Sequence, residues 1–207
     1  MSVGIVDYGM GNLRSIEKAL ARLGQKPLVS GRLEDLEGCE ALVLPGVGAF
    51  GDAVANLKRA GLDQYIKDRV EGGTPLLGIC LGLQLLLDES EEMGKHAGLG
   101  LVPGRVVRFN TKEKVPQIGW NVVEFTEDAA ALSEGLPSGT HFYFVHSYHA
   151  VLLDPKNGWG WTEYGGVLYA SVVATRGGKV VATQFHPEKS GKWGLRLLEN
   201  YFSNLAD

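Results

Sequence analysis

The 207-residue sequence predicts an α/β fold in which a single domain holds a central, mostly parallel sheet flanked by helices, followed by a β-rich C-terminal half. In the first half of the chain, short apolar runs alternate with stretches of helical periodicity, as in parallel sheets with helical crossovers. In the second half, valine-rich and aromatic segments are separated by turn residues. No proline-rich or polar linker divides the chain, so residues 1–207 are expected to form one domain.

The composition is that of an ordinary globular protein, with 44% hydrophobic and 21% charged residues. A net charge of -4 gives no electrostatic basis for nucleic-acid binding. No apolar run approaches the ~20 residues that a membrane span needs, and no signal peptide is visible at the start. The only cysteines are Cys39 and Cys80, which form no disulfide framework, so a cytoplasmic enzyme is expected.

The first elements alternate strictly between strand and helix. Residues 3–6, 27–29, 41–44 and 76–79 are apolar runs of the length of buried strands. Leu13 begins a helical pattern that Gly24 ends. Asp52 is expected to cap a second amphipathic helix. The apolar face of that helix comprises Val54, Leu57, Leu62, Tyr65 and Ile66.

Two glycine-rich loops follow the first and third strands, at the sheet edge where such folds bind ligands. The loop at residues 7–12 begins like a dinucleotide-binding fingerprint, but Arg14 stands at the third glycine position, so nucleotide binding is only an alternative. In the second loop, Gly46, Val47 and Gly48 leave backbone amides free to face a developing negative charge. A plain strand-to-helix turn is the alternative for this loop.

Cys80 lies where the fourth strand turns abruptly into a helix, with Gly78 two residues before it and Gly82 two residues after. This spacing is typical of a nucleophile elbow, in which glycines relieve crowding around a strained turn. Good helix formers continue to Asp88, and the first amides of such a helix favour a thiolate. The alternative is a small, buried, unreactive cysteine.

The C-terminal half is expected to be mostly strands. Residues 103–109, 115–123 and 142–153 have strand composition, and 165–175 with 179–185 are expected to form a hairpin joined by residues 176–178. A last helix is expected over residues 193–202.

His186 ends the second strand of that hairpin, and Pro187 keeps its backbone extended. Residues two apart in extended chain point to the same side, so Glu188 can orient the imidazole. With Cys80, these residues supply the parts of a Cys-His-Glu triad. His146 and His149 are three apart and are expected on opposite faces; with no matching ligand cluster, no metal site is predicted.

Residues 78–84 and 184–188 resemble the two signature motifs of the class I (triad) glutamine amidotransferases, and residues 45–48 resemble their oxyanion strand. Within that family, residues 6–12, 116–121 and 142–148 are similar to the glutaminase subunits of imidazole glycerol phosphate synthases. The resemblance runs from Val3 to the last helix and implies a flavodoxin-like central sheet.

The resemblance implies a chemistry for these residues. Cys80 would attack the side-chain amide of glutamine to form a thioester, with His186 as acid and base and Glu188 as its orienting partner. The oxyanion would be bound by the amide of Leu81 and by one from the loop of Gly46, Val47 and Gly48. The residues that would hold the charged end of glutamine are Gln84, Glu92, Ser147 and Tyr148. No cofactor is implied.

The resemblance also implies a partner. Ammonia would pass through a tunnel to a (β/α)8-barrel cyclase subunit in a heterodimer of histidine biosynthesis. Asn12 and Trp120 would lie on the docking face, and glutaminase activity would be weak without the liganded cyclase. Three alternatives remain open from the sequence: an amidotransferase of another synthase, a cysteine hydrolase or peptidase on a related sheet, and a non-catalytic interaction module.

Overall fold

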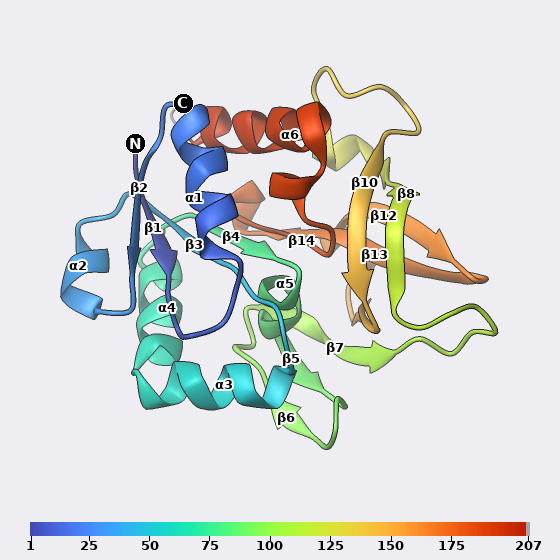
Figure 1. Ribbon diagram of the computed structural model, residues 1–207, viewed down its shortest axis with the longest axis horizontal. Coiled ribbons are helices and arrows are strands. Elements are labelled where there is room, and N and C mark those ends of the chain that lie inside the picture. Colours follow the sequence, from blue (N-terminus) through green and yellow to red (C-terminus); the bar gives the residue numbers. More distant parts are fainter. Residues whose placement is uncertain (206–207) are drawn as a thin grey trace.

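The computed structural model describes residues 1–205, and a continuous sheet runs through the molecule (Figure 1). One half of this sheet is parallel, and helical segments connect its first four strands in chain order. In spatial order its strands are β2 (Lys26–Ser30), β1 (Ser2–Val6), β3 (Ala41–Leu44), β4 (Leu76–Ile79) and β14 (Val180–Thr183). Strands β3 and β4 are buried at every residue, as the apolar runs predict.

The other half of the sheet is mostly antiparallel and begins where β13 pairs with β14. It continues through β13 (Val167–Thr175), β11 (Tyr148–Leu152), β7 (Val102–Arg108), β5 (Leu87–Ser90) and β6 (His96–Ala97). Off this path, β12 (Gly158–Tyr164) pairs with β13 and with β9 (Glu124–Phe125). A separate two-stranded sheet is formed by β8 (Gln117–Val122) and β10 (His141–His146).

Helices cover both faces of the parallel half. Figure 1 shows α1 and α6 on one face and α3 and α4 on the other. The alternation of side chains along β3 fits this arrangement: Leu42 and Leu44 pack with α3 and α4, whereas Val43 packs with α1 and α6. The α-helices are α1 (Leu13–Arg22), α2 (Leu33–Glu37), α3 (Phe50–Arg59), α4 (Leu62–Glu71), α5 (Leu81–Leu85) and α6 (Gly191–Asn204). The 3₁₀ turns are η1 (Glu127–Ala129), η2 (Pro155–Asn157), η3 (Arg176–Gly178) and η4 (Pro187–Lys189).

Two expected helices differ from those in the structure. The helix expected from Asp52 to Ile66 is divided into α3 and α4 by Gly61, whose φ of 68° ends one helix before the next begins. Asp52 lies inside the first turn of α3 and makes no capping hydrogen bond. The helix after Cys80 ends at Leu85, and the chain continues at once as β5, which pairs with β6 and β7.

The expected hairpin and last helix are confirmed: β13 and β14 pair antiparallel around η3, and α6 spans the predicted segment. The expected strand over residues 142–153 is instead two strands in two sheets, because the chain turns at Ser147. As a result, the rings of His146 and His149 both pack against Phe109, with centroids 5.2 and 4.8 Å away, and the prediction of opposite faces was wrong. None of the helices within residues 1–205 is both long and apolar enough to cross a membrane.

Candidate active site

Cys80 occupies a strained turn between β4 and α5. Its φ of 56° and ψ of -105° are unusual for a residue with a side chain, and such strain is often stored at functional sites. The turn needs both flanking glycines: a Cβ at Gly82 would overlap the carbonyl oxygen of Leu44, and one at Gly78 would lie 2.9 Å from the Cβ of Ala182. The geometry of a nucleophile elbow is therefore present, as the sequence predicts.

His186 follows β14, the strand that pairs with the strand leading into Cys80. Its Nδ1 lies 2.8 Å from Oε1 of Glu188, and both side chains are buried. Burial lowers the pKa of His186, but the nearby Cys80 sulfur and the Glu188 carboxylate outweigh this effect and raise the pKa from 6.5 to about 9. Nε2 has no hydrogen-bond partner of good geometry among residues 1–205, so it is the ring nitrogen that can hold a proton received from Cys80.

A serine that the sequence analysis did not single out fixes the backbone of His186. Oγ of Ser190 donates to the carbonyl oxygen of His186 at 2.6 Å and accepts from the N–H of Tyr143 at 2.9 Å. The N–H of His186 in turn donates to the carbonyl oxygen of Tyr143. These bonds attach the turn after β14 to β10, so the imidazole is held from two elements. In the sequence, the only sign of this role is that Ser190 follows His186 closely, at the fourth position after it.

Cys80 opens into a cavity of about 260 Å³. The four residues expected to hold glutamine all line this cavity, although they come from α5, from the loop after β5, from the turn between β10 and β11 and from the first residue of β11. These residues are Gln84, Glu92, Ser147 and Tyr148. The fold thus collects at one place residues that are far apart in the sequence.

Gln84 is less free to bind a ligand than its position suggests. Its Nε2 donates to the carbonyl oxygen of Tyr148 at 3.0 Å and to Oε1 of Gln184 at 3.2 Å. Both N–H groups of Gln84 are therefore engaged within the protein, and only its Oε1 remains available to the cavity. Gln184, which belongs to the second signature motif, also lies 3.8 Å from the sulfur of Cys80.

The expected oxyanion site is closed in this conformation. The N–H of Leu81 donates to the carbonyl oxygen of Gly46 at 3.4 Å, so that oxygen lies where an oxyanion would bind. The N–H of Val47 makes no hydrogen bond within residues 1–205. If the peptide between Gly46 and Val47 rotated, the carbonyl would leave and an N–H would take its place. The loop can approach α5 this closely because Gly46 has no side chain; a Cβ at this position would lie 2.7 Å from the Cβ of Leu81.

The loop that carries this peptide is held at both ends. The hydroxyl of Tyr8 donates to the carbonyl oxygen of Pro45 at 2.6 Å, and the carboxylate of Glu92 accepts from the N–H of Phe50 at 2.7 Å. Burial raises the pKa of Tyr8, so its hydroxyl keeps the proton it donates. Glu92 therefore does two things: it stabilises the start of α3 and it lines the cavity.

The two residues expected at a partner interface differ in exposure. The side chain of Trp120 is 56% exposed on β8, where its ring packs edge-on against Tyr143. Ile118 on the same strand is 64% exposed. Asn12 is half-buried at the start of α1, and its Oδ1 accepts from the hydroxyl of Ser15 at 3.0 Å. An exposed tryptophan beside an exposed isoleucine is typical of a docking surface.

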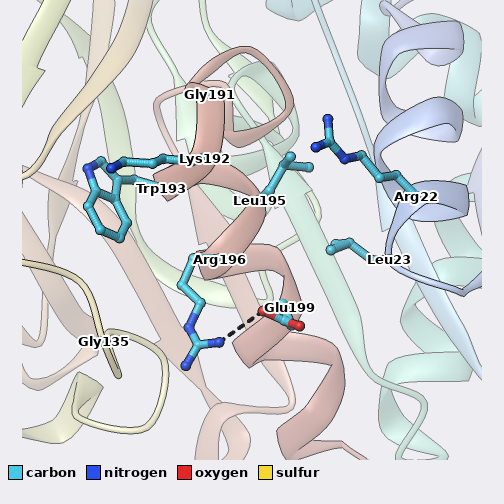
Figure 2. Close-up of a pocket in the computed structure, with 9 residues that line it drawn as sticks. All are labelled: Arg22, Leu23, Gly135, Gly191, Lys192, Trp193, Leu195, Arg196 and Glu199. Carbon is cyan, nitrogen blue, oxygen red and sulfur yellow. Dashed lines mark hydrogen bonds and ion pairs between the residues drawn. The ribbon is translucent and has the colours of Figure 1, made fainter.

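A larger cavity, of about 630 Å³, lies beside α6 (Figure 2). Its cations do not converge on a common point: Arg196 pairs with Glu199 at 3.0 Å, and Lys192 lies over the ring of Trp193. This cavity holds none of the predicted site residues. Within residues 1–205, no cluster of three or more His, Cys, Asp or Glu residues could bind a metal ion.

Comparison with known proteins agrees with this geometry. Residues 4–205 match the family model described as glutamine amidotransferase class-I. Imidazole glycerol phosphate synthase subunit HisH of Moorella thermoacetica is 49% identical over 199 residues, which cover 96% of this chain and 93% of that protein. The subunit of the same name from Geobacillus kaustophilus is 51% identical over 205 residues, covering 96% and 95%.

Solved structures agree as well. A crystal structure of a glutamine amidotransferase has a TM-score of 0.76 at 26% identity and covers 99% of both chains. The structure of PurLQS from Thermotoga maritima has a TM-score of 0.79 at 20% identity, covers 99% of this chain and 98% of that one, and supports the fold alone. This chain belongs to the class-I glutamine amidotransferases and, within them, to the HisH subunits of imidazole glycerol phosphate synthase.

Proposed function

We propose that this chain is the glutaminase subunit of an imidazole glycerol phosphate synthase, acting in histidine biosynthesis. It hydrolyses glutamine to glutamate at Cys80 and passes the ammonia to a cyclase subunit with which it forms a heterodimer. The observation that carries this proposal is the convergence of Cys80, His186 and Glu188 beside a cavity lined by Gln84 and Glu92. Both cysteines are unpaired, which suits a cytoplasmic enzyme.

The reaction begins with the thiol of Cys80. The thiol proton passes to Nε2 of His186, forming the imidazolium that the raised pKa of His186 favours, and the sulfur then attacks the side-chain carbonyl carbon of glutamine. The tetrahedral intermediate then collapses, the C–N bond breaks, and the imidazolium gives its proton to the departing ammonia. Water, deprotonated by His186, attacks the remaining thioester; the C–S bond breaks, glutamate leaves, and the proton on His186 returns to the sulfur of Cys80. Glu188 stabilises the imidazolium through the 2.8 Å contact with Nδ1.

The oxyanion of each tetrahedral intermediate needs hydrogen-bond donors. We assign the N–H of Leu81 as one donor and the N–H of Val47, after rotation of its peptide, as the other. The contact between Leu81 and the carbonyl of Gly46 supports low turnover in the isolated subunit, because the first donor is occupied and the second points away. Docking of the liganded cyclase would favour the rotated peptide and raise the rate.

Ammonia that escaped to water would be protonated and lose its nucleophilicity, so the product must pass directly to the partner. We assign Trp120 and Asn12 to the docking face. The support is the exposure of Trp120 on β8 and the place of Asn12 in the loop after β1, at the edge of the sheet where the strands leading to the site end.

The test measures glutamate formation by the chain alone and by its mixture with the cyclase and the ligand of the cyclase. Wild-type protein should turn over slowly alone and faster in the mixture. Cys80→Ala should abolish turnover in both, whereas Cys39→Ala, at the other buried cysteine, should leave it intact. Turnover that survives Cys80→Ala would refute the thioester mechanism. Equal rates with and without the liganded cyclase would refute the coupling.

A further inference from the structure

Gln184 contacts the sulfur of Cys80 directly. Its side chain is completely buried at the end of β14, and its Nε2 lies 3.8 Å from Sγ of Cys80. The backbone N–H of Gln184 donates to the carbonyl oxygen of Ser171 at 2.8 Å, which fixes the residue in the sheet. The mechanism above uses neither group.

Hydrogen bonding determines which end of the Gln184 amide faces the sulfur. The carbonyl oxygen of Tyr148 can only accept, and it lies 3.0 Å from the amide of Gln84 and 2.8 Å from Nδ1 of His146. Gln84 must therefore present its NH₂ group on this side. The second N–H of that group requires an acceptor, which is Oε1 of Gln184 at 3.2 Å. Gln184 is left with its own NH₂ group toward Cys80.

We propose that Gln184 is a positioning residue for the nucleophile, whose side-chain N–H stabilises negative charge on the sulfur of Cys80 while Gln84 holds that N–H in place. A donor to a charged acceptor stabilises the charged form over the neutral one. A side-chain donor is needed here because α5 has only five residues and its first N–H, that of Leu81, is bonded to Gly46. The inference rests on the proposed role of Cys80 as nucleophile.

Other ionisable groups around the sulfur act alongside this donor. His186, supported by Glu188, is the positive partner, and its pKa is raised to about 9 in spite of burial. Burial lowers the pKa of His146 to about 3, so this ring stays neutral at ordinary pH. Burial raises the pKa of Tyr8, which also stays neutral. Across the cavity lie two further groups, Glu92 and Tyr148. Replacing a neutral amide leaves all these groups unchanged.

The test follows the alkylation of Cys80 by iodoacetamide across about pH 5–10, in full-length protein carrying Cys39→Ala so that one thiol reports. Gln184→Leu keeps most of the volume and removes the donor. The pH at half-maximal rate should rise by about one unit, a roughly tenfold loss of reactive thiolate at lower pH. Gln64→Leu, an exposed glutamine on α4, is the matched control and should not shift the profile. A folded Gln184→Leu protein with the parent profile would overturn the proposal.

A second variant tests the role of Gln84, and it also tests the proposed role of Gln184 if the Gln184→Leu protein does not fold. Gln84→Met removes the donor that orients the Gln184 amide, so the profile should shift in the same direction but less far. In a Gln184→Leu background it should add no further shift, because the two residues act in series. An unshifted Gln84→Met profile, or one that shifts equally in both backgrounds, would overturn the inference.

The same measurement separates this inference from the proposed function. If Cys80 in the parent protein alkylates only at the pH of an ordinary thiol, near about 8.5, then no activated nucleophile is present and the proposed mechanism fails. If the parent profile lies lower and does not respond to Gln184, the mechanism stands and the positioning role falls. A merely structural role for Gln184 would lower thermal stability without moving the pH profile.

Discussion

Replacing Val47 with proline removes a single N–H from the loop beside Cys80. In the observed conformation that N–H donates to nothing within residues 1–205, and the Val47 side chain is 40% exposed. Val47 is not among the residues with positive φ, so proline is not excluded by a left-handed backbone here. Val47→Pro should therefore leave the fold and the closed conformation largely unchanged.

The expected effect on catalysis follows from two unequal energies. The bond between the N–H of Leu81 and the carbonyl of Gly46 is 3.4 Å long, so its net contribution is at most about 1 kcal/mol. A donor to the oxyanion typically lowers the barrier by about 3–4 kcal/mol. Rotating the peptide is thus inexpensive compared with what the second donor supplies. Val47→Pro should reduce cyclase-stimulated turnover 10²–10³-fold, an order-of-magnitude figure for one lost donor.

The assay compares initial rates of glutamate formation with and without saturating, liganded cyclase. Turnover of the isolated subunit should change little in Val47→Pro, because the carbonyl of Gly46 still occupies the site. Val47→Ala, which keeps the N–H and shortens the side chain, should be stimulated like the wild type. Both variants should bind the cyclase equally well in a titration. Normal stimulation of Val47→Pro would show that the second donor is a different group.

Three further outcomes are expected. Gly82→Ala should lower the free energy of unfolding, measured in urea, by about 1–3 kcal/mol, because its Cβ would overlap a carbonyl of β3. Gly38→Ala is the control, since a Cβ there meets nothing within 4 Å, and it should match the wild type. Equal urea midpoints for Gly82→Ala and the wild type would contradict the prediction. The pKa of His186 rises from 6.5 to about 9 on folding, so protonation of His186 stabilises the folded state. This stabilisation is complete below pH 6.5 and is lost as the pH rises to about 9. The free energy of unfolding should fall by roughly 3 kcal/mol across that window and by less in Cys80→Ala; a flat wild-type profile would refute this. Trp120→Ala should weaken cyclase binding by about 2 kcal/mol, roughly 30-fold, and an unchanged Kd would remove Trp120 from the interface.

The parts of the fold and site that the sequence predicts are those determined by neighbouring residues. Glycines on either side of Cys80 indicate a tight turn whatever packs around it, and the structure has that turn. The expected closeness of His186 and Glu188 is present, with Nδ1 and Oε1 2.8 Å apart, but the expected extended chain is not: only His186 is extended, and Pro187 begins the 3₁₀ turn η4 that carries Glu188. The alternation of apolar runs with helical periodicity likewise gives the parallel half of the sheet.

The errors arise where distant segments decide the outcome. Residues 83–87 are apolar enough for a helix or a strand, and the helix ends at Leu85 because β5 pairs with β7, a contact that no local pattern encodes. The turn at Ser147 divides an apparently continuous strand because β10 pairs with β8 and β11 with β7. The hydrogen bonds of Gln184 also depend on distant segments, because they join the end of β14 to Gln84 in α5 and to Ser171 in β13.

The orientation of the peptide between Gly46 and Val47 is a property that no motif determines, because glycine allows either orientation at little cost. The structure nevertheless limits what can change. Tyr8 holds the carbonyl of Pro45 and Glu92 holds the N–H of Phe50, so motion is confined to the few residues between these anchors. His186 and Glu188 are already paired next to Cys80. A partner that acts on this site therefore needs to rotate one peptide, and it need not assemble the triad.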